Sequence, residues 1–331
     1  MVFAFAVLAL AAAQAPQQTI SRLFAATPDG PYISYSWGEH WSRLRADMRG
    51  FDGTLDTFVC LGPWVFAGGP RGLFVSEDFG ENYRKVSGWP DAGPAVTHLL
   101  AARLFALEPT LFVGTSNGLY RSTGPASDWL RVGEAMIQGP VRDMSWPGPE
   151  LFVATDSGLF RTRDKGERFA RVGAGLPDAP LLALAVSRFF SLEPTVFVGT
   201  GGAGLYKSVD GGEKFEAVGA DLLGKETVRA LVWWGGLLIA GADGGLFLSD
   251  DGGKKFKKAR DLEGRRILSI SVPGAEEDVA SDVIVGTDGG VLKSSDGAQR
   301  FRPVQEGMGS LAVRALATFP LPPQSRERRS R

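Results

Sequence analysis

The residues of this chain that could do acid–base chemistry are mostly aspartates, and many of them recur in one pattern. A serine or threonine stands two positions before an aspartate, a glycine usually follows two positions later, and an aromatic residue stands seven positions after the hydroxyl. The copies that retain the aspartate are Ser76/Asp78, Thr162/Asp164, Ser208/Asp210, Ser249/Asp251 and Ser294/Asp296. In a turn, such an aspartate accepts backbone N–H groups while glycine supplies a positive φ. We therefore predict that these pairs are structural rather than catalytic.

A second group combines arginines with a separate set of aspartates. The arginines each follow a valine at the start of a predicted strand, and they are Arg142, Arg229 and Arg314. The aspartates each follow a different apolar run, and they are Asp156, Asp243 and Asp288. The arginines either form ion pairs with these carboxylates or bind an anionic group of a ligand. The aspartates either stabilise turns or form a ring that binds a polyhydroxyl ligand.

Trp89 is the aromatic candidate for binding. It lies in a segment between repeats, and every such segment carries an apolar residue six or seven places after the aromatic position. Trp89 either caps the edge of its own repeat or forms an exposed apolar rim with Met136 and Met308. Such a rim would suit a protein partner.

Cysteine and histidine are too few for several kinds of chemistry. The single cysteine, Cys60, excludes an internal disulfide framework, and the two histidines, His40 and His98, exclude a His/Cys metal cluster. The net charge of −1 provides no broad cationic field for nucleic acid. We therefore expect no metal, no cofactor and no nucleic-acid partner, and we interpret His98 as a hydrogen-bonded structural histidine.

The aspartate pattern recurs because the chain consists of seven repeats. The hydroxyl residue falls at positions 34, 76, 122, 162, 208, 249 and 294, so the spacing is 40 to 46 residues. Each repeat contains short apolar runs bounded by glycine, such as 111–115, 196–200 and 283–287, which predict buried strands. Four short strands per unit of about 40–45 residues are typical of a propeller blade. The prediction is an all-β, seven-bladed β-propeller, with strands A to D in each blade.

The ends of the chain predict how the ring closes. The first repeat has no strand A, whereas residues 313–319 form an additional strand of that type after the seventh repeat. Insertion of this strand into the first blade would remove an open sheet edge. We predict one propeller over residues 16–319 and a disordered basic tail over residues 320–331.

Residues 1–15 form an apolar leader. Positions 2 to 13 contain no polar residue, and this stretch is shorter than the roughly 20 residues of a transmembrane helix. It has the character of the apolar core of a secretory signal peptide. We predict no transmembrane span and an extracytoplasmic location, either periplasmic or secreted.

The repeated motif, from Ser34 to Phe301, resembles the Asp-box of BNR-repeat proteins. Sialidases, xyloglucan-degrading glycosidases, sortilin-type receptors and photosystem II assembly-factor-like propellers share this motif. The resemblance implies a sialidase-like propeller with a repeat architecture of the WD40/YVTN kind. It also implies that the Asp-box turns lie opposite the usual binding face, which is formed by the B–C and D–A loops.

Two functions of different classes fit this resemblance. A glycoside hydrolase needs two acids about 5–5.5 or 6.5–9.5 Å apart, for which Asp156, Asp243 and Asp288 are candidates. However, the chain lacks the Arg-Ile/Leu-Pro motif of sialidases, which typically have six blades, and it has room for only one of the two propellers of the xyloglucan enzymes. We therefore predict an exported, monomeric scaffold without catalytic residues that binds a protein or glycan, with a sialidase-like or xyloglucanase-like hydrolase as the alternative.

Overall fold

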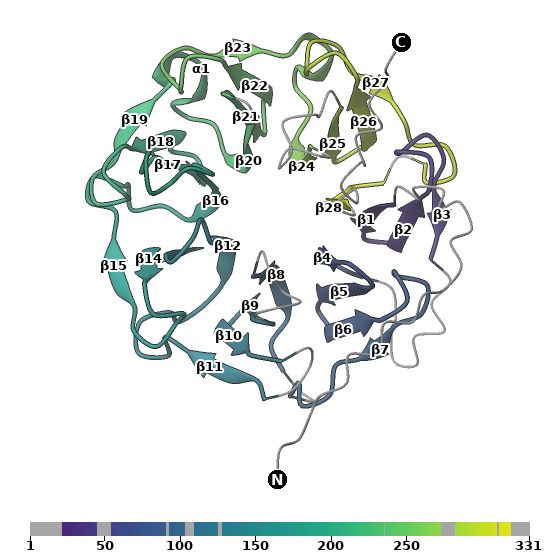
Figure 1. The fold of residues 1–331 in the computed structure, drawn as a ribbon. Coiled ribbons are helices and arrows are strands. Elements are labelled where there is room, and N and C mark those ends of the chain that lie inside the picture. The colour runs from purple at the N-terminus through teal and green to yellow at the C-terminus, as the bar shows by residue number, and fades with distance from the viewer. Residues whose placement is uncertain are drawn as a thin grey trace, which may run out of the picture.

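A computed structural model describes residues 22–44, 54–90, 93–102, 109–124, 128–234, 236–272, 282–309 and 311–318. These residues form seven four-stranded antiparallel sheets arranged as blades around a central axis (Figure 1). The all-β, seven-bladed prediction is confirmed. The predicted leader (1–15) and basic tail (320–331) lie outside the described residues.

Each blade runs from strand A at the axis to strand D at the rim. Blades 1 and 2 contain β28 (Ala315–Thr318), β1 (Leu23–Thr27), β2 (Gly30–Ser34), β3 (Ser42–Arg43), and β4 (Thr57–Leu61), β5 (Trp64–Gly69), β6 (Gly72–Ser76), β7 (Arg84–Lys85). Blades 3 and 4 contain β8 (Val96–Ala101), β9 (Leu111–Thr115), β10 (Gly118–Ser122), β11 (Leu130–Val132), and β12 (Val141–Ser145), β13 (Leu151–Thr155), β14 (Gly158–Thr162), β15 (Ala170–Val172). Blades 5 and 6 contain β16 (Leu181–Val186), β17 (Val196–Thr200), β18 (Leu205–Ser208), β19 (Glu216–Val218), and β20 (Val228–Trp234), β21 (Leu237–Ala242), β22 (Gly245–Ser249), β23 (Lys257–Lys258). Blade 7 contains β24 (Ile267–Ser271), β25 (Val283–Thr287), β26 (Gly290–Ser294) and β27 (Arg302–Pro303). Two short helical turns, α1 (Ala220–Leu223) and the 3-10 turn η1 (Arg260–Leu262), lie in D–A loops.

The ring closes inside blade 1, as the sequence predicts. The C-terminal strand β28 pairs antiparallel with β1, so that Leu23 lies opposite Thr318 and Ala26 opposite Ala315. The Trp41 indole N–H of blade 1 donates a hydrogen bond to the Val304 carbonyl of blade 7 at 2.7 Å. The first and last strands of the propeller therefore share one sheet, and the inner edge of β1 is paired.

Neighbouring blades pack through a phenylalanine in strand B and the glycine of the next blade's repeated motif. A Cβ on Gly212 would lie 3.0 Å from a ring carbon of Phe152, and one on Gly253 would lie 2.8 Å from Phe197. The same contact relates Gly80 to Phe24 and Gly166 to Phe112. In blade 7, Ala298 takes the place of the glycine, and strand B of blade 6 carries Ile239 in place of phenylalanine. The glycine of the motif thus makes room for a ring of the preceding blade.

The start of strand A packs in a similar way on the preceding blade. Val96, Val141 and Val228 lie against Gly68, Gly114 and Gly199, at distances that leave no room for a Cβ on the glycine. A register shift follows each of these valines. The β-bulge inserts one extra residue at this point, which is Arg142 in blade 4 and Arg229 in blade 6. The fold thereby positions these arginines at the axis.

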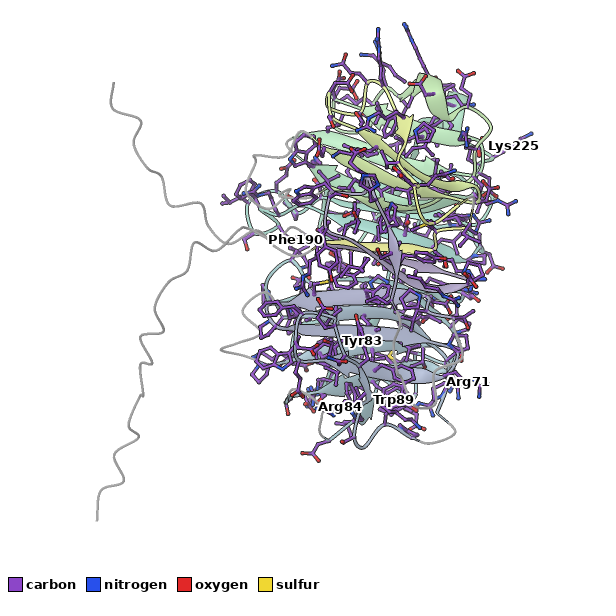
Figure 2. The ribbon with its side chains drawn as sticks, turned by 90° about the vertical axis from the view of Figure 1, so that its right-hand side faces the viewer. Arg71, Tyr83, Arg84, Trp89, Phe190 and Lys225 are labelled. Carbon is purple, nitrogen blue, oxygen red and sulfur yellow. The ribbon has the colours of Figure 1, made fainter. Side chains whose placement is uncertain are left out.

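The disc has two distinct faces. The B–C turns and D–A loops form one face, here called the B–C face, and the A–B loops and C–D turns form the other, here called the C–D face. In an edge-on view, Arg71 and Lys225 lie on the B–C side and Phe190 on the C–D side (Figure 2). Among the described residues, no helix is long and apolar enough to cross a membrane.

Candidate functional site

The repeated Ser/Thr-x-Asp motif forms a closed set of hydrogen bonds in each C–D turn. The Ser208 hydroxyl donates to Asp210 Oδ1 at 2.6 Å, and the same oxygen accepts the backbone N–H groups of Glu213 (3.1 Å) and Lys214 (3.0 Å). The Gly212 N–H donates to Ser208 Oγ at 2.9 Å. These hydrogen bonds hold the pKa of Asp210 below its ordinary value.

The other four motif copies have the same arrangement. Their hydroxyl-to-carboxylate distances are 2.7 Å for Ser76/Asp78, 2.7 Å for Thr162/Asp164, 2.8 Å for Ser249/Asp251 and 2.8 Å for Ser294/Asp296. In each turn one carboxylate oxygen serves both the hydroxyl and the backbone. Such a set of contacts stabilises a turn and commits one carboxylate oxygen to it.

In blade 4, one of the predicted arginines forms an ion pair with one of the predicted aspartates near the axis. Arg142 donates from Nε and Nη2 to the two carboxylate oxygens of Asp156, at 2.7 and 2.8 Å. Asp156 stands in a tight B–C turn, which is closed by a hydrogen bond from the Thr155 hydroxyl to the Gly158 carbonyl at 2.8 Å. A bidentate pair of this kind fixes both side chains.

Blade 6 repeats this arrangement with an additional cation. Arg229 binds the two carboxylate oxygens of Asp243 at 2.7 and 3.1 Å, and Arg266 Nε lies 3.2 Å from Asp243 Oδ1. The hydrogen bonds from Arg229 hold the pKa of Asp243 below its ordinary value. Two guanidinium groups therefore share one carboxylate at this point of the B–C face.

Arg314 and Asp288 do not form a third pair of this kind. Arg314 instead donates a hydrogen bond to Asp56 of blade 2 at 2.7 Å. Arg314 directly precedes β28 of blade 1, and Asp56 directly precedes β4, the strand A of blade 2. Asp56 was absent from our sequence-derived candidates, although it follows the apolar residue Leu55 just as Arg142 follows Val141. Asp288 is exposed and forms no ion pair with any residue that the structure describes.

Of the two interpretations of Trp89, the structure does not bear out the exposed rim. Trp89 is only 4% exposed, and it packs against Tyr120 and Trp129 with ring centroids 5.2 Å apart in each case. Met308 is also buried, and only Met136 of the three is exposed. The segment after β7 folds back onto blade 3, so Trp89 belongs to the core rather than to a binding surface.

A half-buried pair that the sequence did not reveal lies on the inner strands. His98 Nε2 of blade 3 lies 3.3 Å from Asp143 Oδ1 of blade 4. The same carboxylate accepts the backbone N–H of Met144 at 2.7 Å and, through Oδ2, that of Leu184 in blade 5 at 2.7 Å. Burial raises the pKa of Asp143. This one carboxylate connects the inner strands of three consecutive blades.

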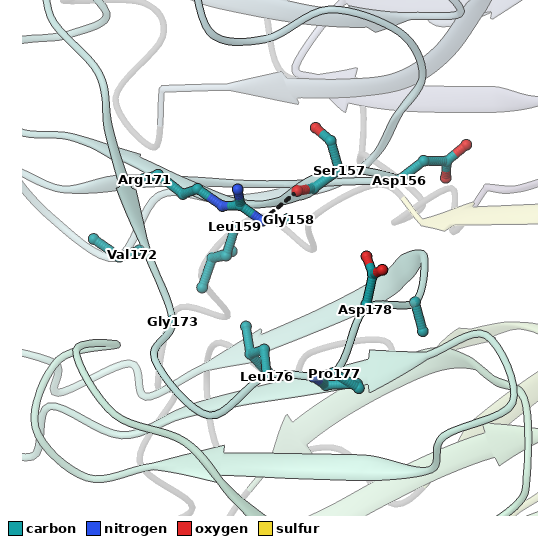
Figure 3. A pocket seen from close by; sticks show the side chains of 11 residues that line it. Asp156, Ser157, Gly158, Leu159, Arg171, Val172, Gly173, Leu176, Pro177 and Asp178 are labelled. Atoms are coloured by element: carbon teal, nitrogen blue, oxygen red, sulfur yellow. Dashed lines mark hydrogen bonds between the residues drawn. The ribbon is translucent and has the colours of Figure 1, made fainter.

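A small hollow opens beside Asp156 on the B–C face (Figure 3). Its walls include Arg171 on one side and Leu176 and Asp178 on the other. The Arg171 guanidinium donates to the Ser157 carbonyl at 2.9 Å, which braces the B–C turn from strand D. The hollow is lined mainly by polar groups.

No protein-family model matches the chain, and no curated protein matches its sequence. Solved structures do match its fold. The extracellular domain of a putative hybrid two-component system, BT4673 of B. thetaiotaomicron, aligns with a TM-score of 0.61 and 18% identity over 75% of this chain and 33% of that one. The chain thus spans one third of the length of that domain.

Structures of two other proteins give similar alignments. YCF48 from Cyanidioschyzon merolae aligns with a TM-score of 0.62 and 15% identity over 85% of this chain and 97% of its own. A YCF48 structure bound to a D1 peptide aligns with a TM-score of 0.56 and 14% identity over 75% of this chain and 81% of its own. The GH74 xyloglucanase from Xanthomonas campestris aligns with a TM-score of 0.61 and 14% identity over 91% of this chain and 52% of its own. At these identities the alignments show the propeller fold alone.

Proposed function

We propose that the protein is an exported, non-enzymatic interaction scaffold of the Asp-box propeller type, which binds a protein or glycan partner on its B–C face. In this proposal residues 1–15 are a leader, residues 16–319 the propeller and residues 320–331 a tail. The observation that carries the proposal is the cluster of Arg229, Arg266 and Asp243 at the axial mouth. It holds two guanidinium groups against one carboxylate.

This cluster suits recognition of an anionic group. Bidentate pairing fixes the arginine side chains before a partner arrives, so less conformational entropy is lost on binding. The second guanidinium adds a cation beside Asp243, and a guanidinium is a donor that a carboxylate of a peptide or of an acidic sugar can pair with. Arg142 and Arg314 extend the same rim of ion pairs around the axis, with Asp156 and Asp56 as their partners.

The carboxylates of this face fit catalysis less well. A general acid that acts near neutral pH needs a raised pKa, whereas the pKa of Asp243 is lowered. Asp156 has both oxygens occupied by Arg142. The alternative function is a glycoside hydrolase that uses Asp156, Asp243 or Asp288. The fold that the chain shares with the GH74 enzyme is compatible with this alternative.

A pull-down from the native envelope fraction tests the proposal. The wild-type chain is compared with the triple variant Arg142→Glu/Arg229→Glu/Arg314→Glu. The matched control is Lys254→Glu/Lys255→Glu/Arg300→Glu, which changes the net charge equally in exposed C–D turns. We expect wild type and control to retain the same partner and the arginine variant to lose it. Retention by all three would contradict the proposed site, and hydrolysis of xyloglucan or a sialoside by the wild type would favour the alternative.

A further inference from the structure

The outer edge of blade 6 carries a run of basic side chains that the proposed function does not use. They are Lys254 and Lys255 in the C–D turn, Lys257 and Lys258 in β23, and Arg260 in η1, and all five are exposed. These five residues are here called the basic edge. Because β23 is the outermost strand of its blade, the basic edge lies at the circumference of the disc, far from the axial arginines (Figure 1).

Apolar residues between the cations fix the direction in which the basic edge faces. Phe256 and Ala259 are only 7% and 4% exposed, and Leu262 is fully buried. A buried residue therefore anchors every third position, and the remaining positions from 254 to 260 are all basic and face solvent. An extended segment of this length spans at most about 20 Å. The fold thus presents five cations in one narrow row.

The positive charge is specific to this blade. Residues 250–266 contain seven basic and four acidic residues, whereas the corresponding segment of blade 5, residues 209–225, contains two basic and four acidic residues. The net charge of the whole chain is −1. A local excess of cations can therefore attract anions at this edge although the molecule as a whole does not.

Most acids of the same segment are already bound. Asp251 Oδ1 accepts two backbone N–H groups of its own turn at 2.9 and 3.0 Å, and Asp261 Oδ2 accepts a backbone N–H of blade 7 at 2.9 Å. Asp250 Oδ2 lies 3.4 Å from Lys257 Nζ. Glu263, the fourth acid, is exposed. Two of the four carboxylates thus serve the backbone rather than the side chains of the basic edge.

The basic edge differs from the outer edges of other blades in having cations without an internal partner. Lys254, Lys255 and Arg260 form no ion pair with any residue that the structure describes, and Lys258 Nζ lies over the Phe247 ring, 5.6 Å from its centroid. In five other blades an ion pair holds a cation of the outer strand or of the turn before it: Arg43–Asp29, Arg84–Glu77, Arg131–Glu134, Lys214–Glu216 and Arg302–Glu39. An external anion can therefore pair with the basic edge without breaking a contact of the fold.

We propose that the basic edge binds a linear acidic polysaccharide, whose carboxylate or sulfate groups pair with the row of cations. Lysine is a compact point charge on a flexible stem, which suits repeated anionic groups without one fixed geometry. A flat membrane would also meet the edge of blade 5, where Glu213 and Glu216 are exposed. Single-stranded nucleic acid is bound through stacking on aromatic rings, and the rings at this edge, Phe247 and Phe256, are buried. A single charged chain that follows one blade therefore fits best.

Equilibrium binding of labelled polygalacturonate and dextran sulfate to the full chain tests this proposal, at low and at molar salt, with neutral dextran as the uncharged probe. The edge variant is Lys254→Gln/Lys255→Gln/Lys258→Gln. The matched control is Arg168→Gln/Lys214→Gln/Lys225→Gln, which neutralises three exposed cations of blades 4 and 5. We expect the edge variant to bind about tenfold more weakly at low salt and the control to bind as wild type. The difference should vanish at molar salt because the charges are then screened.

Three results would overturn the proposal. The wild type could fail to bind either acidic polysaccharide at low salt, or the control could lose as much binding as the edge variant. Alternatively, duplex DNA or phosphatidylglycerol vesicles could bind through the same lysines more tightly than both polysaccharides, which would identify another class of partner.

The basic edge is tested independently of the axial arginine cluster. The variant Lys254→Glu/Lys255→Glu/Arg300→Glu leaves the axial arginines unchanged, so we expect it to lose the polysaccharide and to retain the partner from the envelope fraction. The variant Arg142→Glu/Arg229→Glu/Arg314→Glu should show the reverse. Polysaccharide binding that depends on the axial arginines and not on the lysines would contradict this proposal and leave the proposed function intact.

Discussion

Gly253 of blade 6 lies directly against the ring of Phe197 in blade 5, and a Cβ at this glycine would approach ring carbon Cε1 to 2.8 Å. Three further blade interfaces pair a phenylalanine with a motif glycine, whereas Ile239 and Ala298 occupy the equivalent positions at the interface of blades 6 and 7. The blade interfaces therefore pack in two different ways. A ring requires glycine opposite to it, and a smaller branched side chain accepts alanine.

The first prediction uses this pairing. Gly253→Ala should lower the free energy of unfolding by about 1–3 kcal/mol, because the new methyl group overpacks a fully buried ring and the φ of 87° disfavours alanine. Phe197→Ile should also destabilise, through lost volume. In the double variant, chemical denaturation should show a favourable coupling, because the pair then resembles Ile239 and Ala298. Strict additivity of the two single changes would contradict the packing argument.

The second prediction concerns the repeated motif. Asp210→Ala should lower the free energy of unfolding by about 0.5–2 kcal/mol, as when a capping side chain is lost, with the lower end favoured because the site is exposed to solvent. The folded-state pKa of Asp210 is lowered, so its contribution is present above the ordinary carboxyl pKa and is lost as pH falls through the folded value. Denaturation at neutral and acidic pH should therefore show a difference that shrinks in acid. An equal difference at both would argue against the carboxylate's role in the turn.

The sequence predicts some of these features and leaves others undetermined. The blades and the closing strand follow from local patterns, namely short apolar runs, glycines and a repeat of constant frame. The pairing of Arg142 with Asp156 was one of two interpretations, because both lie at fixed positions of one repeat. Arg314 bonds Asp56 of another blade, and the repeat pattern contains no information on that contact.

Trp89 and Asp143 make contacts that the sequence patterns do not predict. The period of the repeat placed Trp89 in a D–A loop, but the direction of a loop depends on which neighbour it can pack against, and here that neighbour is Trp129. Asp143 lies in a predicted strand between an arginine and a methionine, with no local sign of a partner. Its contacts with His98 and Leu184 exist only because three blades meet at the axis.

The third prediction concerns the half-buried carboxylate of Asp143. Asp143→Ala should lower the free energy of unfolding by about 1–3 kcal/mol, because it leaves the Met144 and Leu184 N–H groups without their acceptor. Burial raises the folded-state pKa of Asp143 above its ordinary value. Its contribution is then fully present below the ordinary carboxyl pKa and declines as pH rises through the folded value.

Chemical denaturation of wild type and Asp143→Ala across the range from acid to neutral pH measures this dependence. His98 is the side chain that the described structure places against the carboxylate, so His98→Gln serves as the control that retains a polar neighbour without the imidazole ring. A difference between wild type and Asp143→Ala that grows with pH would show instead that the two backbone donors and His98 favour the ionised form.

The last prediction concerns the closure of the ring. A chain that ends at Gly309 lacks β28, and with it the pairing to β1, the Arg314–Asp56 ion pair and the hydrogen bond from the Ser269 hydroxyl to the Val313 carbonyl at 3.1 Å. Blade 1 would then present β1 as an open inner edge, with unpaired backbone groups that favour aggregation. We expect this chain to lose its cooperative thermal transition and to aggregate on expression.

A chain that ends at Thr318 is the matched control, because it retains β28 and removes only residues 319–331. If those residues form a tail outside the propeller, as we propose, its melting temperature should equal that of the full chain. Circular dichroism and sedimentation of the three chains distinguish the cases. A cooperative, monomeric chain ending at Gly309 would mean that contacts such as that of Trp41 with Val304 suffice to close the ring. A destabilised chain ending at Thr318 would instead extend the propeller beyond β28.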